Sequence, residues 1–235
     1  MNEFYHKFYS QYLQRDFELL VFGHSGKPVI IFPKAGCRYY EMKDRGVIND
    51  LACQLEAGTI KIYCPDTIDY ESWYNYSIDP ESRVRKHILY EQTIMKDVID
   101  FARYELDEEN VWLAGFEFGA YHSTNIALKH PDIVSGLFCL GGTYNIKKHI
   151  MGFYNEDCYF NNPPDYLPGL TDEWYLNYLK KNNIKICVGS SDSHINENLI
   201  LSENLREKGI NHLFEICDGF GDDFDFYKSK FASYF

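Results

Sequence analysis

The segment from residue 111 to residue 122 constrains the fold of this chain more than any other. It reads Val-Trp-Leu-Ala-Gly-Phe-Glu-Phe-Gly-Ala-Tyr-His, with an apolar run that stops at Gly115 and a helical pattern that starts after Gly119. Two glycines four residues apart allow a chain to turn sharply from a strand into a helix. The residue between them is then held beyond the end of the strand in a strained conformation. Because Glu117 occupies that position, we predict that its carboxylate projects from the carboxyl edge of a sheet.

Strand-sized apolar runs alternate with helical patterns along most of the chain. Before the turn Gly23-His24-Ser25-Gly26, apolar and polar residues alternate, which predicts antiparallel strands. Later apolar runs span 28–33, 60–64, 111–114, 134–140, 184–188 and 212–217. Helical patterns span 46–56, 83–104, 120–129, 202–208 and 226–235. This order predicts an α/β fold with a mostly parallel sheet, helices on both faces, and ligand sites beyond the carboxyl ends of the strands.

The domain organisation is simple. The 235 residues contain no linker, internal repeat or low-complexity stretch, which predicts a single domain over 1–235. One long insertion, 143–179, is rich in Tyr, Asn and Pro. It is long enough to form a cap over the strand ends.

Charge and cysteine content limit the partners and the compartment. The 23 Lys and Arg against 35 Asp and Glu give a net charge of −12, without the basic clusters that bind phosphates, so we expect no nucleic-acid partner. No apolar run approaches the roughly 18–20 residues of a membrane helix, so we expect no membrane partner. The N-terminus lacks the pattern of a signal peptide, and the seven cysteines include no C-x-x-C pair. These features predict buried free thiols in a cytoplasmic protein without a cofactor.

Several further stretches carry a family resemblance. They lie at 23–29, at 32–33 leading to 36–41, and at 71–75, 119–122, 129–132, 141–144 and 159–163. Taken in this order with the turn at Glu117, they make the chain similar, over almost its full length, to the α/β-hydrolase-fold esterases. The similar branch includes esterase D-like and enterochelin-esterase-like enzymes. The resemblance implies an α/β-hydrolase fold with an esterase-type site at the carboxyl edge of the sheet.

The resemblance assigns three positions to a catalytic triad. The family's nucleophilic serine falls on Glu117, and its acid falls on Asp192, just past the strand 184–188. The family's histidine precedes the last helix, where this chain has Asp222-Asp223-Phe224. Asp222 therefore stands in place of the histidine, and two of the three residue types are changed.

These replacements remove the usual chemistry of the triad. Acyl transfer by a serine needs a hydroxyl that attacks and an imidazole that moves its proton near neutral pH. We therefore expect a pseudo-esterase that binds a small ligand or a protein partner. The alternative is an active carboxylic-ester hydrolase or acyltransferase with a carboxylate-based or metal-based mechanism. In the first form Glu117 would be the nucleophile, and Asp222, whose ordinary pKa is about 4, would have to act as the base.

Three carboxylates at one cleft would repel one another. We expect one of Glu117, Asp192 and Asp222 to take up a proton, in preference to the binding of a cation by all three. We therefore assign no metal site, although oxygen ligands suit Ca²⁺, Mg²⁺ or Mn²⁺.

The resemblance also implies an oxyanion hole and a pocket. The oxyanion hole would consist of the backbone N–H groups of Cys37 and Phe118. The expected pocket residues are Trp73, Tyr74, Tyr121 and His194. A thiol nucleophile at Cys37 is disfavoured because no histidine partner is evident. A homo-oligomer is also expected as a possible assembly.

Overall fold

The computed structural model describes residues 2–235 and contains one eight-stranded sheet. The strands are β1 (Glu3–Ser10), β2 (Arg15–Phe22), β3 (Lys27–Phe32), β4 (Ile60–Pro65), β5 (Val111–Phe116), β6 (Val134–Leu140), β7 (Asn183–Gly189) and β8 (His212–Cys217). Every strand predicted from an apolar run is present. The runs were recognisable because Gly or Pro bounds them and because β3 to β7, which are largely buried on both faces, consist mostly of apolar residues. β8 is only partly buried.

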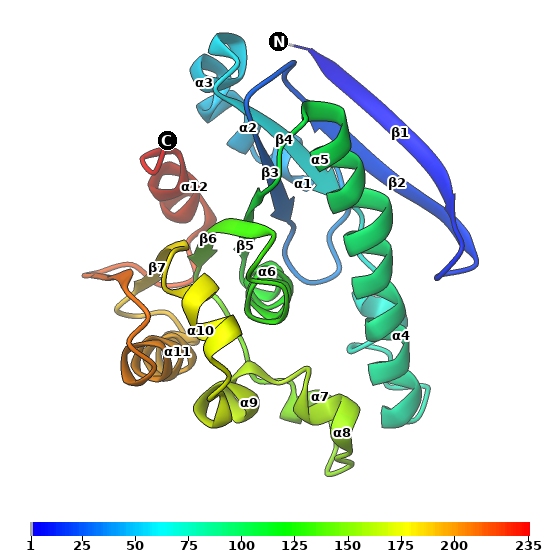
Figure 1. The fold of residues 1–235 in the computed structure, drawn as a ribbon, viewed down its shortest axis with the longest axis vertical. Coiled ribbons are helices and arrows are strands. Elements are labelled where there is room, and N and C mark those ends of the chain that lie inside the picture. The colour runs from blue at the N-terminus through cyan, green and yellow to red at the C-terminus, as the bar shows by residue number, and fades with distance from the viewer. Residues whose placement is uncertain (1) are drawn as a thin grey trace.

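The sheet has the order β1-β2-β4-β3-β5-β6-β7-β8 (Figure 1). β1 pairs with β2, and β2 with β4, in antiparallel register. All other neighbours, from β4 to β8, are parallel. The prediction of a mostly parallel sheet with antiparallel N-terminal strands is therefore confirmed, and β5, which leads to Glu117, lies in the middle of the parallel part.

Helices cover both faces of the sheet. They are α1 (Glu41–Asp44), α2 (Val47–Asp50), α3 (Ala52–Ala57), the 3₁₀ turn η1 (Asp69–Glu71), α4 (Pro80–Thr93), the π-helical η2 (Ile94–Ile99), α5 (Asp100–Leu106), α6 (Phe118–Lys129), α7 (Lys147–Ile150), α8 (Glu156–Tyr159), α9 (Pro163–Gly169), α10 (Glu173–Leu179), α11 (Ile195–Glu207) and α12 (Phe224–Ala232). One core lies between the sheet and α4 to α6 with α9 to α11, and the other between the sheet and α1 to α3 with α12 (Figure 1). None of the helices within 2–235 has the length and apolar character needed to cross a bilayer.

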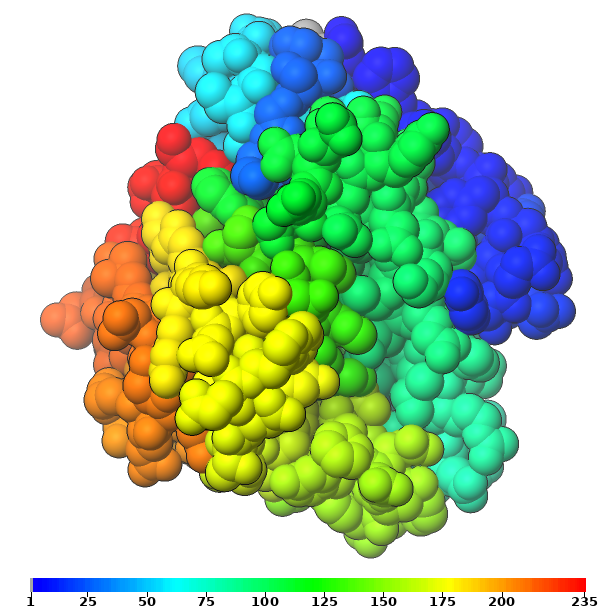
Figure 2. Space-filling view, in the orientation of Figure 1, coloured from blue at the N-terminus to red at the C-terminus, as the bar shows by residue number. Residues whose placement is uncertain are grey.

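The insertion at 143–179 folds into the helices α7 to α10. α7 and α8 contact α4, whereas α9 and α10 contact α6 and α9 also contacts α11. Figure 2 shows the insertion in yellow-green and yellow along one face of the molecule, next to these helices. Leu167, Leu176 and Leu179 from the insertion are buried in the main core.

The turn between β5 and α6 depends on two glycines. Glu117, between them, has φ 52° and ψ −112°, a backbone conformation that an L-residue rarely adopts. A Cβ atom on Gly119 would lie 2.4 Å from the carbonyl oxygens of Phe32 and Pro33. A Cβ atom on Gly115 would lie 2.1 Å from the backbone of Gly119. The start of α6 therefore packs against the end of β3 at a distance that only glycine allows.

We predict that Gly119→Ala lowers the free energy of unfolding by about 2 kcal/mol or more, because the methyl group meets backbone atoms that cannot rotate away. Urea denaturation followed by circular dichroism measures the change. Gly169→Ala is the matched control, because its Cβ would meet only the Tyr159 hydroxyl, at 3.1 Å. Equal effects of the two substitutions would contradict this account of the turn.

Candidate functional site

Glu117 faces a lysine that the sequence analysis did not single out. Lys34 Nζ lies 3.3 Å from Glu117 Oε2 and 3.5 Å from Asp222 Oδ1. Lys34 comes just after β3, Glu117 lies between β5 and α6, and Asp222 lies between β8 and α12. One ammonium group therefore joins three loops at the carboxyl edge of the sheet.

This ion triad changes the expected electrostatics of the site. We expected Glu117, Asp192 and Asp222 to repel one another, but Lys34 neutralises part of the negative charge. Burial alone would lower the pKa of Lys34, but the carboxylates of Glu117 and Asp222 outweigh it and raise that pKa. Lys34 therefore stays protonated near neutral pH and is a poor nucleophile. Among residues 2–235, no group of three or more His, Cys, Asp and Glu side chains is arranged to hold a metal ion.

The triad leaves almost no open space beside Glu117. A cavity of about 10 Å³ remains there, which is room for no more than about one water molecule. It is lined by Lys34, Phe116, Glu117, Leu140, Gly141, Asp222, Phe224 and Tyr227. The cavity itself therefore has no room for an acyl group, although the side chain of Glu117 is 25% exposed to solvent.

Asp192 belongs to a neighbouring group of hydrogen bonds. Its Oδ2 accepts a hydrogen bond of 2.5 Å from the hydroxyl of Tyr227, which extends from α12. Its Oδ1 accepts the backbone N–H of His194 at 2.7 Å and lies 3.3 Å from His194 Nδ1. Because Tyr227 also lines the small cavity with Glu117 and Asp222, the three predicted triad positions meet through Lys34 and Tyr227 and do not touch directly.

The Asp192–His194 pair shifts the pKa values of both residues. Burial would raise the pKa of Asp192, but the hydrogen bonds from His194 and Tyr227 lower it. The contact of its ring with the Asp192 carboxylate is the largest cause of the raised pKa of His194, burial opposes it, and the carboxylates of Glu197 and Glu117 add to it. His194 therefore lies directly beside Asp192, and its role as a pocket residue stays a prediction.

The expected oxyanion hole is only partly available. The backbone N–H of Cys37 donates to the carbonyl of Lys34 at 3.0 Å and closes a turn. Phe118 is the first residue of α6, and the first N–H groups of a helix have no partner within it. The thiol of Cys37 is an unsuitable nucleophile, because burial and, secondarily, Glu41 raise its pKa to about 12.

Two of the four predicted pocket residues are core residues, which corrects the prediction for them. Trp73 and Tyr121 are 0% exposed and pack together in a small core with Phe118. The Tyr121 hydroxyl donates to the carbonyl of Asn161 at 2.9 Å. Tyr74 is half-buried, and its ring packs edge-on against Phe118 with centroids 5.1 Å apart. Of the three aromatic residues predicted for the pocket, Tyr74 is therefore the one that is partly exposed.

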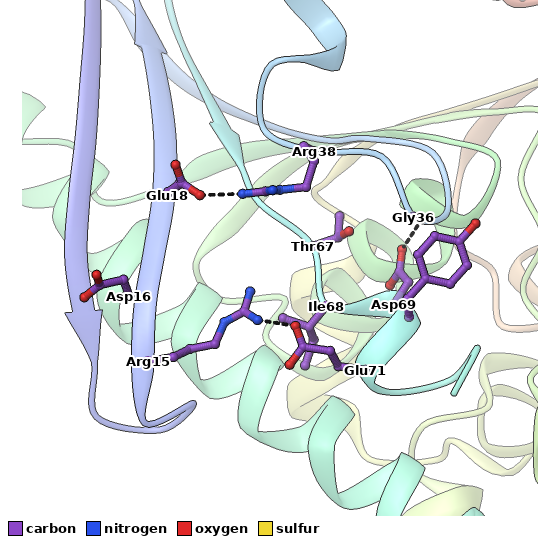
Figure 3. Close-up of a pocket in the computed structure, with 10 residues that line it drawn as sticks. Arg15, Asp16, Glu18, Gly36, Arg38, Thr67, Ile68, Asp69 and Glu71 are labelled. Atoms are coloured by element: carbon purple, nitrogen blue, oxygen red, sulfur yellow. Dashed lines mark hydrogen bonds and ion pairs between the residues drawn. The ribbon is translucent and has the colours of Figure 1, made fainter. Parts of the chain in front are cut away.

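A larger cleft lies on the other side of the loop that follows β3. Its volume is about 440 Å³, and it is lined by Arg15, Asp16, Glu18, Gly36, Arg38, Thr67, Ile68, Asp69, Tyr70 and Glu71. Arg15 reaches from β2 to Glu71, and Arg38 reaches back to Glu18 (Figure 3). The cleft therefore lies at the carboxyl edge of the sheet but has charged walls, and sequence reasoning missed it because its residues come from three separate segments.

Asp69 connects this cleft with α6. Its Oδ2 accepts the backbone N–H of Gly36 at 3.1 Å, and its Oδ1 lies 2.9 Å from Nε2 of His122 on α6. Both side chains of the Asp69–His122 pair are 1% exposed. The loop after β3 is therefore fixed to α6 by a buried pair.

Comparisons with known proteins bear on the fold. A ferulic acid esterase superposes with a TM-score of 0.76 over 99% of this chain and 95% of its own, at 15% identity. An S-formylglutathione hydrolase from Agrobacterium tumefaciens gives a TM-score of 0.75 over 98% and 91%, at 13% identity. One from Staphylococcus aureus gives a TM-score of 0.71 over 99% and 96%, also at 13% identity. The fold is that of the α/β-hydrolase esterases. No family model and no curated protein matches the sequence.

The Asp192–His194 pair predicts a pH-dependent contribution to stability. The lowered pKa of Asp192 stabilises the folded protein above the ordinary value of about 3.9, and this stabilisation is lost as the pH falls through the lowered value. The raised pKa of His194 stabilises it below about 6.5, and that stabilisation is lost as the pH rises through the raised value. We therefore predict that His194→Ala costs about 1 kcal/mol at a pH of about 5.5 and clearly less at a pH of about 9.

Urea denaturation at the two pH values measures this difference. The same substitution in an Asp192→Asn background is the control, because the imidazole then lacks its carboxylate and the difference between the pH values should disappear. A cost of His194→Ala that is equal at both pH values in the wild type would contradict the assignment.

Proposed function

We propose that this protein is a non-catalytic esterase-fold protein, which binds a small polar ligand or a protein partner at the carboxyl edge of its sheet. The observation that carries the proposal is the ion triad of Lys34, Glu117 and Asp222. In this triad a carboxylate stands where the family nucleophile is expected, and a lysine and an aspartate take up the space around it.

The chemistry of the triad supports this proposal. A carboxylate paired with an ammonium group is stabilised in its ground state, which weakens it as a nucleophile. Asp222 is half-exposed and carries no ring nitrogen, so it lacks the imidazole that moves protons near neutral pH. The acid position, Asp192, is already bonded to Tyr227. Each part of a serine-type triad is therefore either replaced or engaged in another contact.

A hydrolase that uses Glu117 as a carboxylate nucleophile is the second candidate. The 3.3 Å contact between Asp192 and His194 favours it, because an imidazole oriented by a carboxylate can activate water against an ester intermediate. The space of about 10 Å³ beside Glu117 argues against it, since no acyl group fits there without rearrangement. Since no metal-binding group is present within 2–235, we do not propose a metal-based mechanism.

The cleft of Figure 3 is the site that we propose for the ligand. Its volume of about 440 Å³ falls within the usual range of small-molecule sites. Its walls carry two arginines and four carboxylates, so a ligand must be polar and must form hydrogen bonds that compensate for those it displaces.

We predict that purified wild type hydrolyses short-chain p-nitrophenyl esters no faster than its Glu117→Ala variant, and that a fluorophosphonate probe does not label it, because no activated hydroxyl is present at the turn. The double variant Glu117→Ser/Asp222→His restores both residue types and should gain a small activity above this background. Release of p-nitrophenol, with and without Mg²⁺, Ca²⁺ or Mn²⁺, measures the rates. Turnover by wild type that both Glu117→Ala and His194→Ala abolish would overturn the proposal and support the carboxylate nucleophile.

We also predict that a polar ligand found by a thermal-shift screen of small metabolites loses affinity by about tenfold in Arg15→Met, because the substitution removes a charged donor from the wall of the cleft. Calorimetric titration of the two proteins gives both dissociation constants. Lys148→Met, on α7 and away from the cleft, is the control. Unchanged affinity in Arg15→Met would place the ligand elsewhere.

A further inference from the structure

β1 is an edge strand, and the backbone groups on its outer side pair with no other strand of the sheet. It ends the strand order, so β2 is its only neighbour in the sheet, and on the face shown in Figure 2 no other segment covers the outer side of the hairpin. All eight residues pair with β2 in continuous register, without a bulge or a proline. Phe4, Tyr5 and Tyr9 are 45%, 53% and 52% exposed. Natural proteins commonly protect such edges with bulges, prolines or several charges, and this one carries one glutamate and one lysine.

The register shows which backbone groups of β1 face outward. The N–H of Gly23 donates to the carbonyl of Asn2 at 3.0 Å, and Glu3 lies opposite Phe22. In an antiparallel pair, hydrogen-bonded residues alternate with residues whose backbone groups face away. The even-numbered residues of β1 therefore bond to β2. The N–H and C=O groups of Glu3, Tyr5, Lys7 and Tyr9 face outward.

Only the outward-facing residues of β1 can pair with another strand. This leaves few registers in which the β1 strands of two copies of the chain can pair with each other. If the twofold axis of the strand pair passes at Lys7, the two Lys7 residues lie opposite each other. A register that pairs Glu3 with Tyr9 leaves Lys7 opposite Tyr5. A centre at Tyr5 places Glu3 opposite Lys7, and twofold symmetry forms this pair twice. Opposite charges across a strand pair stabilise it, and like charges destabilise it.

We propose that two copies of this chain form a symmetric dimer through antiparallel pairing of their β1 strands, centred on Tyr5. The pairs of Glu3 with the partner's Lys7, Tyr5 with the partner's Tyr5, and Lys7 with the partner's Glu3 each provide two backbone hydrogen bonds, about six in all. The two eight-stranded sheets then join into one continuous sheet, and neither β1 keeps an exposed edge.

Side chains on both sides of β1 are compatible with this register. A hollow of about 650 Å³ runs beside β1 and is lined in part by His6, Phe8, Asp97 and Phe101. In the proposed register the partner's Phe4 lies opposite His6, on the face of the sheet where the His6 and Phe101 rings pack 5.4 Å apart. Its ring can therefore enter the hollow and lose its exposure.

The present ion pairs of the two charged residues do not oppose the dimer. Glu3 pairs with Lys43 at 2.7 Å and Lys7 pairs with Asp16 at 2.9 Å. The four side chains are 38–56% exposed, and ion pairs at such exposed positions contribute little to stability. They can rearrange toward the partner or share a charge with it at small cost.

Sedimentation velocity over a range of concentrations tests the proposal. We expect wild type to reach twice the monomer mass of 27.6 kDa and Glu3→Lys and Lys7→Glu each to dimerise about tenfold or more weakly, because each opposes like charges. The Glu3→Lys/Lys7→Glu double variant should recover the dimer. An equal mixture of the two single variants should also recover it, as a heterodimer. Lys148→Glu, which makes the same charge change on α7, is the control and should leave dimerisation unchanged.

A second pair of variants separates the backbone contribution from that of the side chain. Tyr5→Pro removes an N–H that β2 does not use, so the strand stays in its own sheet. Tyr5→Ala removes the same phenol and keeps the N–H. We expect Tyr5→Pro to dimerise far more weakly than Tyr5→Ala, with matching circular dichroism spectra. A wild type that stays monomeric up to about 100 µM, a dimer insensitive to Lys7→Glu, or a double variant as weak as the single variants would each overturn the proposal.

Discussion

The close approach of Gly119 to the end of β3 determines the geometry of the whole carboxyl edge. No side chain fits between Gly119 and the carbonyl groups of Phe32 and Pro33, so the start of α6 is pressed against the loop that carries Lys34. Glu117 is held in its strained conformation by hydrogen bonds of its N–H to Leu140 and of its carbonyl to Thr143. Strain of this kind costs about 1–3 kcal/mol and persists only where the surroundings impose it. Here β3, β5 and β6 together impose it.

In this chain the strained turn presents the carboxylate of Glu117 at the carboxyl edge of the sheet. A strained turn next to two carboxylates needs a counter-charge, since like charges within a few ångströms raise the free energy of the folded protein. Lys34 supplies that charge from the loop after β3, and its pKa is raised because Glu117 and Asp222 outweigh the effect of burial. The negative charge at the strained turn is therefore balanced within the protein by Lys34.

The fold could be predicted from the sequence more completely than the site. Strands such as β4 and β7 were recognisable because their residues are buried on both faces and Pro or Gly ends them. The strained turn followed from glycine spacing alone, which is a local property. The role of Lys34 could not be predicted in the same way, because its two partners come from loops that meet it only through the order of the strands. Its position after β3, at the edge where ligands bind in such sheets, was the one available signal.

The misplaced aromatic residues have a similar explanation. Tyr121 was expected near the pocket because it belongs to the stretch 119–122, which carries part of the family resemblance. Its side chain instead packs against Trp73. Its hydroxyl donates a hydrogen bond to the Asn161 carbonyl, which compensates for the loss of water on burial. Whether an aromatic residue lines a pocket or fills a core depends on where neighbouring helices pack, and the packing of α4 against α7 and α8 is a tertiary property.

Tyr227 already donates a hydrogen bond to the buried carboxylate of Asp192. In a serine-type triad the acid orients a histidine through a hydrogen bond. Here the oxygen Oδ2 of Asp192 receives its hydrogen bond from Tyr227, whose own hydroxyl also accepts the N–H of Gly189. Burial and the hydrogen bond to Asp192 raise the pKa of Tyr227 well above its usual value, so the phenol remains a donor throughout the neutral range. A histidine introduced at position 222 would have to compete for Asp192 with a donor that α12 already holds in place, so the packing of α12 bears on this site as much as the residues at positions 117 and 222 do.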